Sequence, residues 1–87
     1  MSLSSIKSLV IFDPDDRFKP FLYCIFDTPT SGRFIWTDEP NPLAITAFDE
    51  RDISFKRVLE RLEPEDRIIA AYSDLFVTPV DITELQI

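Results

Sequence analysis

Short runs of apolar residues, separated by prolines and acidic turns, occupy the N-terminal half of the chain. The first three cover residues 6–12, 21–26 and 33–37. Runs of this length between turn-forming residues are typical of β-strands. The loop before the third run ends in Gly32, the single glycine, which we expect to take the positive φ that a short hairpin loop often requires. The pattern predicts two successive hairpins of an antiparallel sheet.

A pattern with helical spacing follows in the middle of the chain. Its apolar positions, at i, i+3, i+4 and i+7, are Phe55, Val58, Leu59 and Leu62. We expect this helix to begin near Asp49 or Asp52, because either side chain can cap free backbone amides. It should end near Leu62, since Pro64 disfavours its continuation. For the short apolar run at residues 43–48 we favour a strand over an irregular segment.

The segment 64–76 is compatible with two structures. Its apolar residues repeat at helical spacing, and Pro64 suits the first turn of a new helix. The competing interpretation is a strand from Arg67 to Tyr72 that follows a tight turn. We favour the helix and leave the strand open. The remaining residues, 77–87, are broken by a proline and indicate an extended tail or an edge strand.

These elements predict an α+β fold, a small antiparallel sheet of three to five strands with N-terminal hairpins and with one or two helices packed on one face. Along the second strand both alternating sets of side chains are apolar, so both faces of the sheet need cover. One helix is about 10 Å wide and covers roughly two strands. We therefore expect a homodimer, or a larger assembly, built by packing the sheets or by joining edge strands. The alternative is that a second helix or the C-terminal tail covers the other face within one chain. The candidate partner-binding residues of the homodimer are the aromatic side chains Tyr23, Phe34 and Trp36.

Composition limits the size and the chemistry of the protein. The 87 residues, 45% of them hydrophobic, are enough for one domain. We assign that domain to residues 1–87, with residues 1–5 as a disordered tail or in part a remnant of an expression vector. The chain has no His, one Cys and one Gly, which excludes imidazole catalysis, a zinc site of thiolates or imidazoles, an internal disulfide and a glycine-rich phosphate loop. We expect no enzyme activity and no cofactor.

Charge and cysteine usage bear on partners and location. Sixteen acidic and nine basic residues give a net charge of −7, which disfavours nucleic acids and anionic membrane surfaces as partners. The apolar runs are also too interrupted by charge to span a membrane. A single cysteine, Cys24, indicates no reliance on disulfides and hence a reducing, cytoplasmic compartment. The start of the chain lacks the pattern of an export signal.

The most suggestive group of polar residues follows the first apolar run. Asp13, Asp15 and Asp16 come directly after Phe12. Two aspartates spaced by one residue at the end of a strand can hold Mg²⁺ or act as nucleophile and acid. The simpler interpretation is a turn that ends the strand, and it is the one we favour.

The sequence therefore leads to one main functional hypothesis and two alternatives. The main hypothesis is a small non-catalytic interaction or regulatory protein that acts through a self-associating sheet surface. The first alternative is a metal-binding domain or metal-dependent hydrolase that uses the Asp13–Asp16 cluster. The second is a sensor of a small ligand, with an aromatic pocket around Tyr23, Phe34 and Trp36.

Overall fold

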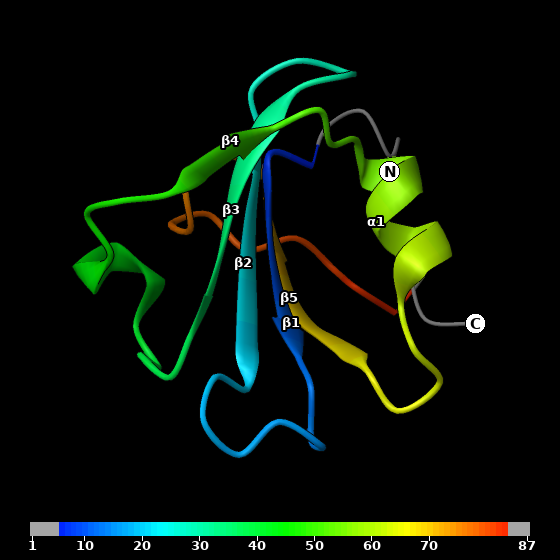
Figure 1. Ribbon diagram of the computed structural model, residues 1–87. Helices are drawn as coiled ribbons and strands as arrows, with labels where there is room; N and C mark the ends of the chain where they lie inside the picture. The colour runs from blue at the N-terminus through cyan, green and yellow to red at the C-terminus, as the bar shows by residue number, and fades with distance from the viewer. Residues whose placement is uncertain (1–5, 84–87) are drawn as a thin grey trace.

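A computed structural model describes residues 6–83 as a five-stranded antiparallel sheet with one α-helix on one face (Figure 1). In chain order the elements are β1 (Ser8–Phe12), β2 (Phe21–Phe26), β3 (Gly32–Thr37), the 3-10 helix η2 (Pro42–Ala44), β4 (Asp49–Arg51), α1 (Phe55–Arg61) and β5 (Arg67–Tyr72). The strand order is β4-β3-β2-β1-β5. The predicted α+β class is confirmed. The expected tail at residues 1–5 and the last residues of the expected C-terminal strand lie outside the described range.

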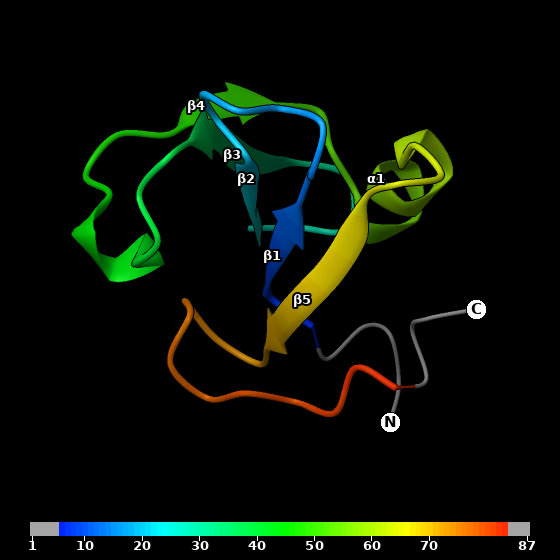
Figure 2. The ribbon, with the colours of Figure 1, turned by 90° about the horizontal axis from the view of Figure 1, so that it is seen from below.

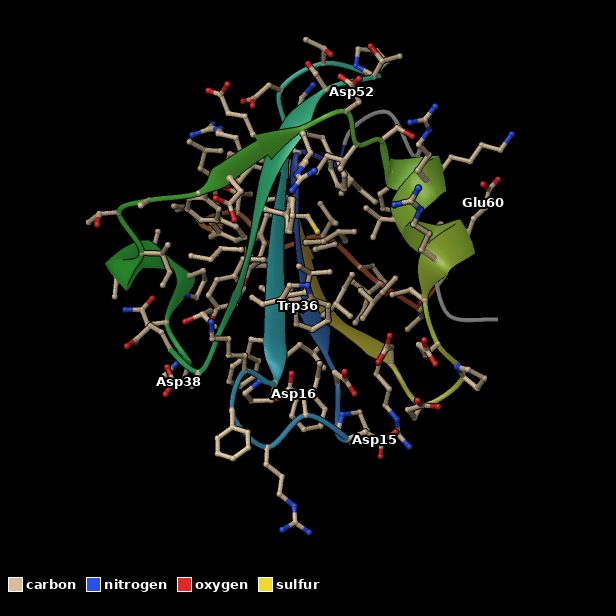
Figure 3. The ribbon with its side chains drawn as sticks, in the orientation of Figure 1. Asp15, Asp16, Trp36, Asp38, Asp52 and Glu60 are labelled. Atoms are coloured by element: carbon tan, nitrogen blue, oxygen red, sulfur yellow. The ribbon has the colours of Figure 1, made fainter. Side chains whose placement is uncertain are left out.

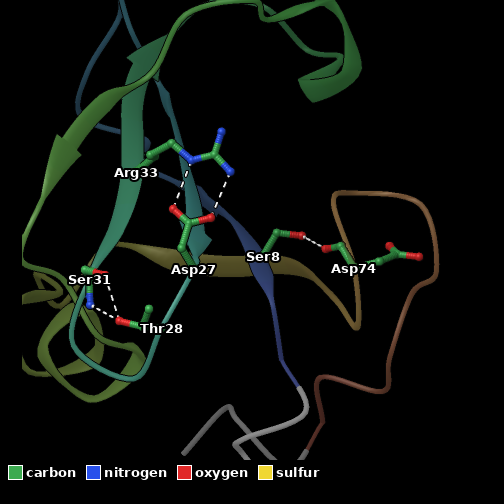
Figure 4. A network of polar contacts seen from close by, with 6 residues as sticks. All are labelled: Ser8, Asp27, Thr28, Ser31, Arg33 and Asp74. Atoms are coloured by element: carbon green, nitrogen blue, oxygen red, sulfur yellow. Dashed lines mark hydrogen bonds and ion pairs between the residues drawn. The ribbon is translucent and has the colours of Figure 1, made fainter.

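The first four strands form a meander, and α1 carries the chain back to the far side of β1. The register sets Leu9 beside Cys24 and Cys24 beside Phe34. The turn between β2 and β3 is held by Arg33 and Asp27, whose ion pair spans 2.9 Å between Nη2 and Oδ1 (Figure 4). No helix within residues 6–83 has the length and apolar character needed to cross a bilayer.

Gly32 is required for a different reason from the one expected. It has no positive φ and is the first residue of β3, not a loop residue. A Cβ placed on it would lie 2.1 Å from the carbonyl oxygen of Ile25 and 2.9 Å from Cγ1 of Ile53. The expectation of a left-handed glycine was therefore wrong. The position is restricted by the close approach of β2 and of the segment after β4.

The favoured helix within 64–76 was also wrong, and the competing strand is correct. Residues Arg67–Tyr72 form β5, which pairs with β1. The register shifts between Val10, which faces Ala70, and Ile11, which faces Ile68. This β-bulge leaves Ile69 without a cross-strand partner and breaks the strict alternation of the strand. Because the period of two is interrupted, the apolar pattern imitates helical spacing.

Two further expectations need correction. Residues 43–48 do not form a strand, because η2 begins at Pro42 and the chain continues without regular structure to β4. The helix is shorter than expected, since Asp49 belongs to β4 and the N-cap is Ser54. The Ser54 hydroxyl accepts a hydrogen bond from the backbone N–H of Arg57, 3.2 Å away.

Each face of the central strands has its own apolar cluster. The cluster beneath α1 is formed by the buried residues Ile6, Leu9, Ile11, Cys24, Phe26, Ile68 and Ala71. Side chains from α1, including Phe55 and Val58, pack against it. The cluster on the opposite face is formed by the buried residues Val10, Tyr23, Ile25 and Phe76, with Phe48 and Tyr72 against them. The observation that both faces are apolar is thus correct.

The chain covers both faces without a second copy. The segment after β5 turns round this edge strand (Figure 2). Phe76 packs on the face opposite α1, while Val80 and Ile82 pack on the α1 side. The segment that contains η2 supplies Ile45 and Phe48 to the same opposite face. The premise that a single chain lacks the material to cover both faces was therefore wrong. The reason lies in two irregular loops that act as a layer of the structure.

Ser8 fixes the position of the loop after β5. The hydroxyl of this fully buried residue of β1 donates a hydrogen bond to the carbonyl of Asp74 (Figure 4). It also accepts a hydrogen bond from the N–H of Phe76 at 3.0 Å. The Asp74 carboxylate accepts hydrogen bonds from the N–H groups of Val77 and Thr78, which lowers the pKa of Asp74. One hydroxyl thus connects β1 to the loop that follows β5.

The substitution Ser8→Ala should lower the free energy of unfolding by about 1–3 kcal/mol, because it leaves the buried N–H of Phe76 without its partner. Urea unfolding followed by circular dichroism measures the effect. Ser73→Ala, at an exposed position next to the same loop, is the matched control and should change stability by less than about 0.5 kcal/mol. Equal stabilities of the two variants would contradict the role given to Ser8.

Candidate functional site

A groove lies between the sheet and α1 on the side of β3. Its volume is about 520 Å³, and its lining residues are Leu22, Cys24, Phe34, Trp36, Arg51, Asp52, Ile53, Val58, Arg61, Leu62 and Asp66. The floor consists of two cross-strand pairs, Cys24 with Phe34 and Leu22 with Trp36. Val58 of α1 and Leu62, the C-cap residue of this helix, form one wall, and the segment after β4 forms the other. The result is an apolar surface inside a concave site.

The groove is open because the helix is short and narrow. With seven residues α1 is about 10 Å long, and at about 10 Å across it covers roughly two of the five strands. It packs over the cluster of β1, β2 and β5 residues and leaves the β3 side partly uncovered. Trp36 consequently keeps 37% of its surface exposed. It is labelled near the centre of Figure 3.

Two arginines give the groove its positive charge. The guanidinium carbon of Arg51, at the end of β4, lies 5.9 Å from the centre of the Phe34 ring, within the range of a cation–π contact. Arg61 is in the last turn of α1, on the other wall. Within residues 6–83 neither side chain forms an ion pair. Both guanidinium groups therefore keep their hydrogen-bond donors free for another group.

Two aspartates also line the groove, but each is placed differently from the arginines. One carboxylate oxygen of Asp66, Oδ2, accepts a hydrogen bond from the N–H of Glu63 at 3.0 Å and closes the turn before β5. The other, Oδ1, is buried and has no partner within the described residues. Asp52 lies at the end of the groove near the β2–β3 loop, away from Trp36 (Figure 3). Neither carboxylate neutralises the guanidinium groups by direct contact.

Cys24 is part of the floor and is chemically protected. Its side chain is 1% exposed, and burial raises the pKa of its thiol to about 12. At neutral pH almost none of it is thiolate, the form that attacks electrophiles and binds metals. Cys24 is therefore an unreactive core side chain. Its role in the groove is to supply apolar surface.

The three aromatic residues proposed from the sequence do not form one site. Phe34 and Trp36 share the groove, but Tyr23 points to the opposite face, because neighbouring positions of a strand alternate. Tyr23 is fully buried there, and its hydroxyl donates a hydrogen bond to the carbonyl of Glu39. Burial raises the pKa of Tyr23 to about 12. The expected pocket around all three side chains was wrong, and two of them belong to a different pocket.

Two of the aspartates after β1, Asp13 and Asp16, serve as acceptors within their own loop, whereas the side chain of Asp15 interacts with that of Glu65. Asp13 accepts a hydrogen bond from the N–H of Asp15 at 3.0 Å. Asp16 accepts hydrogen bonds from the N–H groups of Phe18 and Lys19, which lower the pKa of its carboxyl. In the part of the chain that the structure describes, no three carboxylate, thiolate or imidazole groups are arranged to hold a metal ion. The local geometry is that of a turn, as favoured from the sequence.

The sequence groups Arg51 and Arg61 with Lys56 and Arg57 as a basic patch on one expected helix, which could bind an anionic partner or form ordinary helical ion pairs. In the structure Arg51 belongs to β4 instead, and it shares a groove with Arg61 only through the fold. The residues of the floor follow from strand alternation together with the register of β2 and β3. Residues directly opposite each other in an antiparallel pair share a face, and the register sets Phe34 opposite Cys24 and Trp36 opposite Leu22.

Comparison of the chain with protein-family models, with curated proteins and with solved structures gave no match. The function of the protein is therefore inferred from the groove itself. Its shape, its apolar floor and its two unpaired guanidinium groups are the observations that carry it.

Native Cys24 should react with a disulfide reagent such as dithionitrobenzoate about 10³-fold more slowly than the unfolded chain at pH 8, because a pKa near 12 leaves very little thiolate. Absorbance of the released thiolate follows the reaction. The same protein in 6 M guanidinium chloride is the control and should react quickly, since its thiol then has an ordinary pKa. Fast stoichiometric labelling of the native protein would contradict the buried placement of Cys24.

Proposed function

We propose that the protein is a non-catalytic binding module whose groove between α1 and β3 holds the apolar part of a ligand. The observation that carries this proposal is the 520 Å³ concave site with an apolar floor and a partly exposed tryptophan at its opening. Ligand sites commonly have volumes of about 300–1,000 Å³, are mainly apolar and contain a few polar groups. We keep the interaction or regulatory role inferred from the sequence and assign it to this groove instead of a self-associating sheet surface.

The chemistry of the lining supports binding more than catalysis. Arginine is always protonated and cannot exchange protons with a substrate near neutral pH. The thiol of Cys24 is buried and protonated, and the chain contains no histidine. The remaining titratable groups are Asp52, at one end of the groove, and Asp66, which closes a turn. We propose a cytoplasmic location, because the single cysteine is unpaired and buried.

Titration with 1-octanol, an uncharged probe with an apolar chain, should change the fluorescence of Trp36 in a saturable way. Trp36 is the only tryptophan, so the signal reports on the groove directly. Amide shifts in nitrogen-15 correlation spectra of the same samples should cluster at the residues of the floor and of the α1 wall. The variant Val58→Phe, which fills the groove, should weaken binding by about fivefold or more, since it removes space for roughly one or two methylene groups.

Leu43→Phe, an exposed substitution of comparable size in η2, is the control and should leave binding unchanged. If the probe shifts amides over the whole surface, or if both variants bind as the parent protein does, the groove is not a ligand site. Because the spectra of the parent protein locate the probe, this test does not depend on the folding of Val58→Phe.

Self-association is the second candidate, on a surface different from the one first considered. Both faces of the central strands are covered, but three apolar side chains at the edge of β5 and in the loop after it remain exposed to solvent. They are Ile69, 46% exposed, Leu75, 50% exposed, and Val77, 65% exposed. A homodimer joined at this edge would cover them.

Light scattering coupled to size-exclusion chromatography at high micromolar concentration should then give a dimer mass for the parent protein and a monomer mass for Val77→Asp. A charge placed in an apolar contact opposes association, whereas Leu43→Asp, on the distant η2, should leave the mass unchanged. A monomer mass for the parent protein at that concentration would remove the dimer proposal and leave the groove proposal intact.

A further inference from the structure

We propose that the ligand of the groove is a small amphiphilic acid, a molecule with a carboxylate group on an apolar body. This inference rests on the proposed function and specifies the chemistry of the ligand. It follows from two guanidinium groups that line one groove together with an apolar floor, in a protein that is otherwise strongly acidic.

The two guanidinium groups reach the groove from opposite walls. Arg51 leaves β4 and lies over the ring of Phe34, which is part of the floor. Arg61 leaves the last turn of α1. The guanidinium group is planar and presents parallel N–H donors that match the two oxygens of a carboxylate. An anion between Arg51 and Arg61 would receive charged hydrogen bonds from both sides.

The arrangement is specific to these two arginines. Arg33 forms an ion pair with Asp27, so its charge is already compensated. Arg57 lines a separate, smaller hollow with Thr30 and Ser54. Arg51 and Arg61 alone combine three properties within the described residues: they line the same groove, they lack an ion-pair partner, and they face an apolar floor.

The carboxylates of the groove do not occupy the place of the ligand. The Oδ2 atom of Asp66 is held by the N–H of Glu63, and its Oδ1 atom is buried beneath the surface. Asp52 stands at the far end of the groove, by the β2–β3 loop (Figure 3). Asp52 directly follows Arg51 in the chain, but within residues 6–83 neither Asp52 nor Asp66 forms an ion pair with Arg51 or Arg61. Both guanidinium groups can therefore still receive the head group of an acid.

The floor sets the nature of the rest of the ligand. Leu22, Trp36 and Leu62 offer apolar surface that a hydrocarbon chain or an aromatic ring can cover. Covering it removes apolar area from water on both the ligand and the protein, which stabilises the complex by about 25 cal/mol per Å². A simple inorganic anion would gain none of this contribution. The groove thus favours an anion that carries an apolar body over an anion alone.

The decisive experiment compares three probes with the same chain and different head groups: octanoate, 1-octanol and octylammonium. Titration of Trp36 fluorescence at pH 7 and low salt measures the three affinities. Octanoate should bind most tightly, octanol next and octylammonium most weakly. The affinity for octanoate should be about tenfold higher than that for octanol, the gain expected for charged hydrogen bonds to a partly exposed arginine pair. The preference should decrease as salt increases, because the charges are screened.

Variants assign the preference to the two arginines. Arg51→Gln and Arg61→Gln should each weaken octanoate binding by about three- to tenfold while the affinity for octanol stays within about twofold. Arg57→Gln is the matched control, because it removes one positive charge from the same helix outside the groove. It should leave both affinities unchanged, which separates a local contact from an effect of net charge.

The outcomes separate this inference from the proposed function. Equal binding of octanoate and octanol at the groove, or an equal effect of Arg57→Gln and Arg61→Gln, would overturn the acid proposal and leave the binding module standing. Tighter binding of octylammonium would overturn it as well and assign the carboxylates as the recognition groups. If none of the three probes shifts the groove residues, the proposed function itself fails, and this inference fails with it.

Discussion

The structure depends on one constraint: its two central strands are apolar on both faces, and the chain must cover both. Leu9 and Ile11 of β1 face α1, while Val10 faces the opposite side, and all three are buried. A helix covers one side, and two irregular loops cover the other. Leaving such side chains in water would cost about 1.5–3 kcal/mol each, a large part of the stability of a domain of this size. The loops are therefore a structural layer, not simple connections.

Phe76, which covers the face opposite α1 from a loop, has an unfavourable backbone conformation. Its φ of 65° lies in the left-handed region, which is unfavourable for a bulky residue. The conformation is kept because the ring is buried against Tyr23, Phe48 and Tyr72, with centroid distances of 5.8, 6.4 and 5.7 Å. The hydrogen bond from its N–H to Ser8 fixes the backbone at the same point. Aromatic packing and one buried hydroxyl thus offset local backbone strain.

The sequence was sufficient for the features that depend on short-range pattern, and insufficient for those that depend on the fold. Strands β1 to β3 and the apolar side of α1 follow from alternation and from helical spacing. Strand β5 was misread because the bulge at Ile69 interrupts its alternation, and no residue type marks that bulge. The dimer was favoured over cover by a second helix or by the C-terminal tail, whereas the residues that cover the face opposite α1, Phe48 and Phe76, belong to two irregular loops. In the groove, Phe34 and Trp36 were found, but the convergence of Arg51 with Arg61 required the crossing of α1.

An anionic ligand is consistent with a protein of net charge −7 because the two charges act over different distances. At physiological ionic strength the Debye length is about 8 Å, so most of the carboxylates on this surface are screened from the groove. Arg51 and Arg61 would act at contact distance, above an apolar floor where water is partly displaced and electrostatic attraction is stronger. The overall charge would therefore slow the approach of an anion, and the local pair of arginines would determine whether it stays. This separation also gives the groove selectivity: it excludes large polyanions, which feel many surface carboxylates at once, and admits a small acid whose only charge lies between the two guanidinium groups.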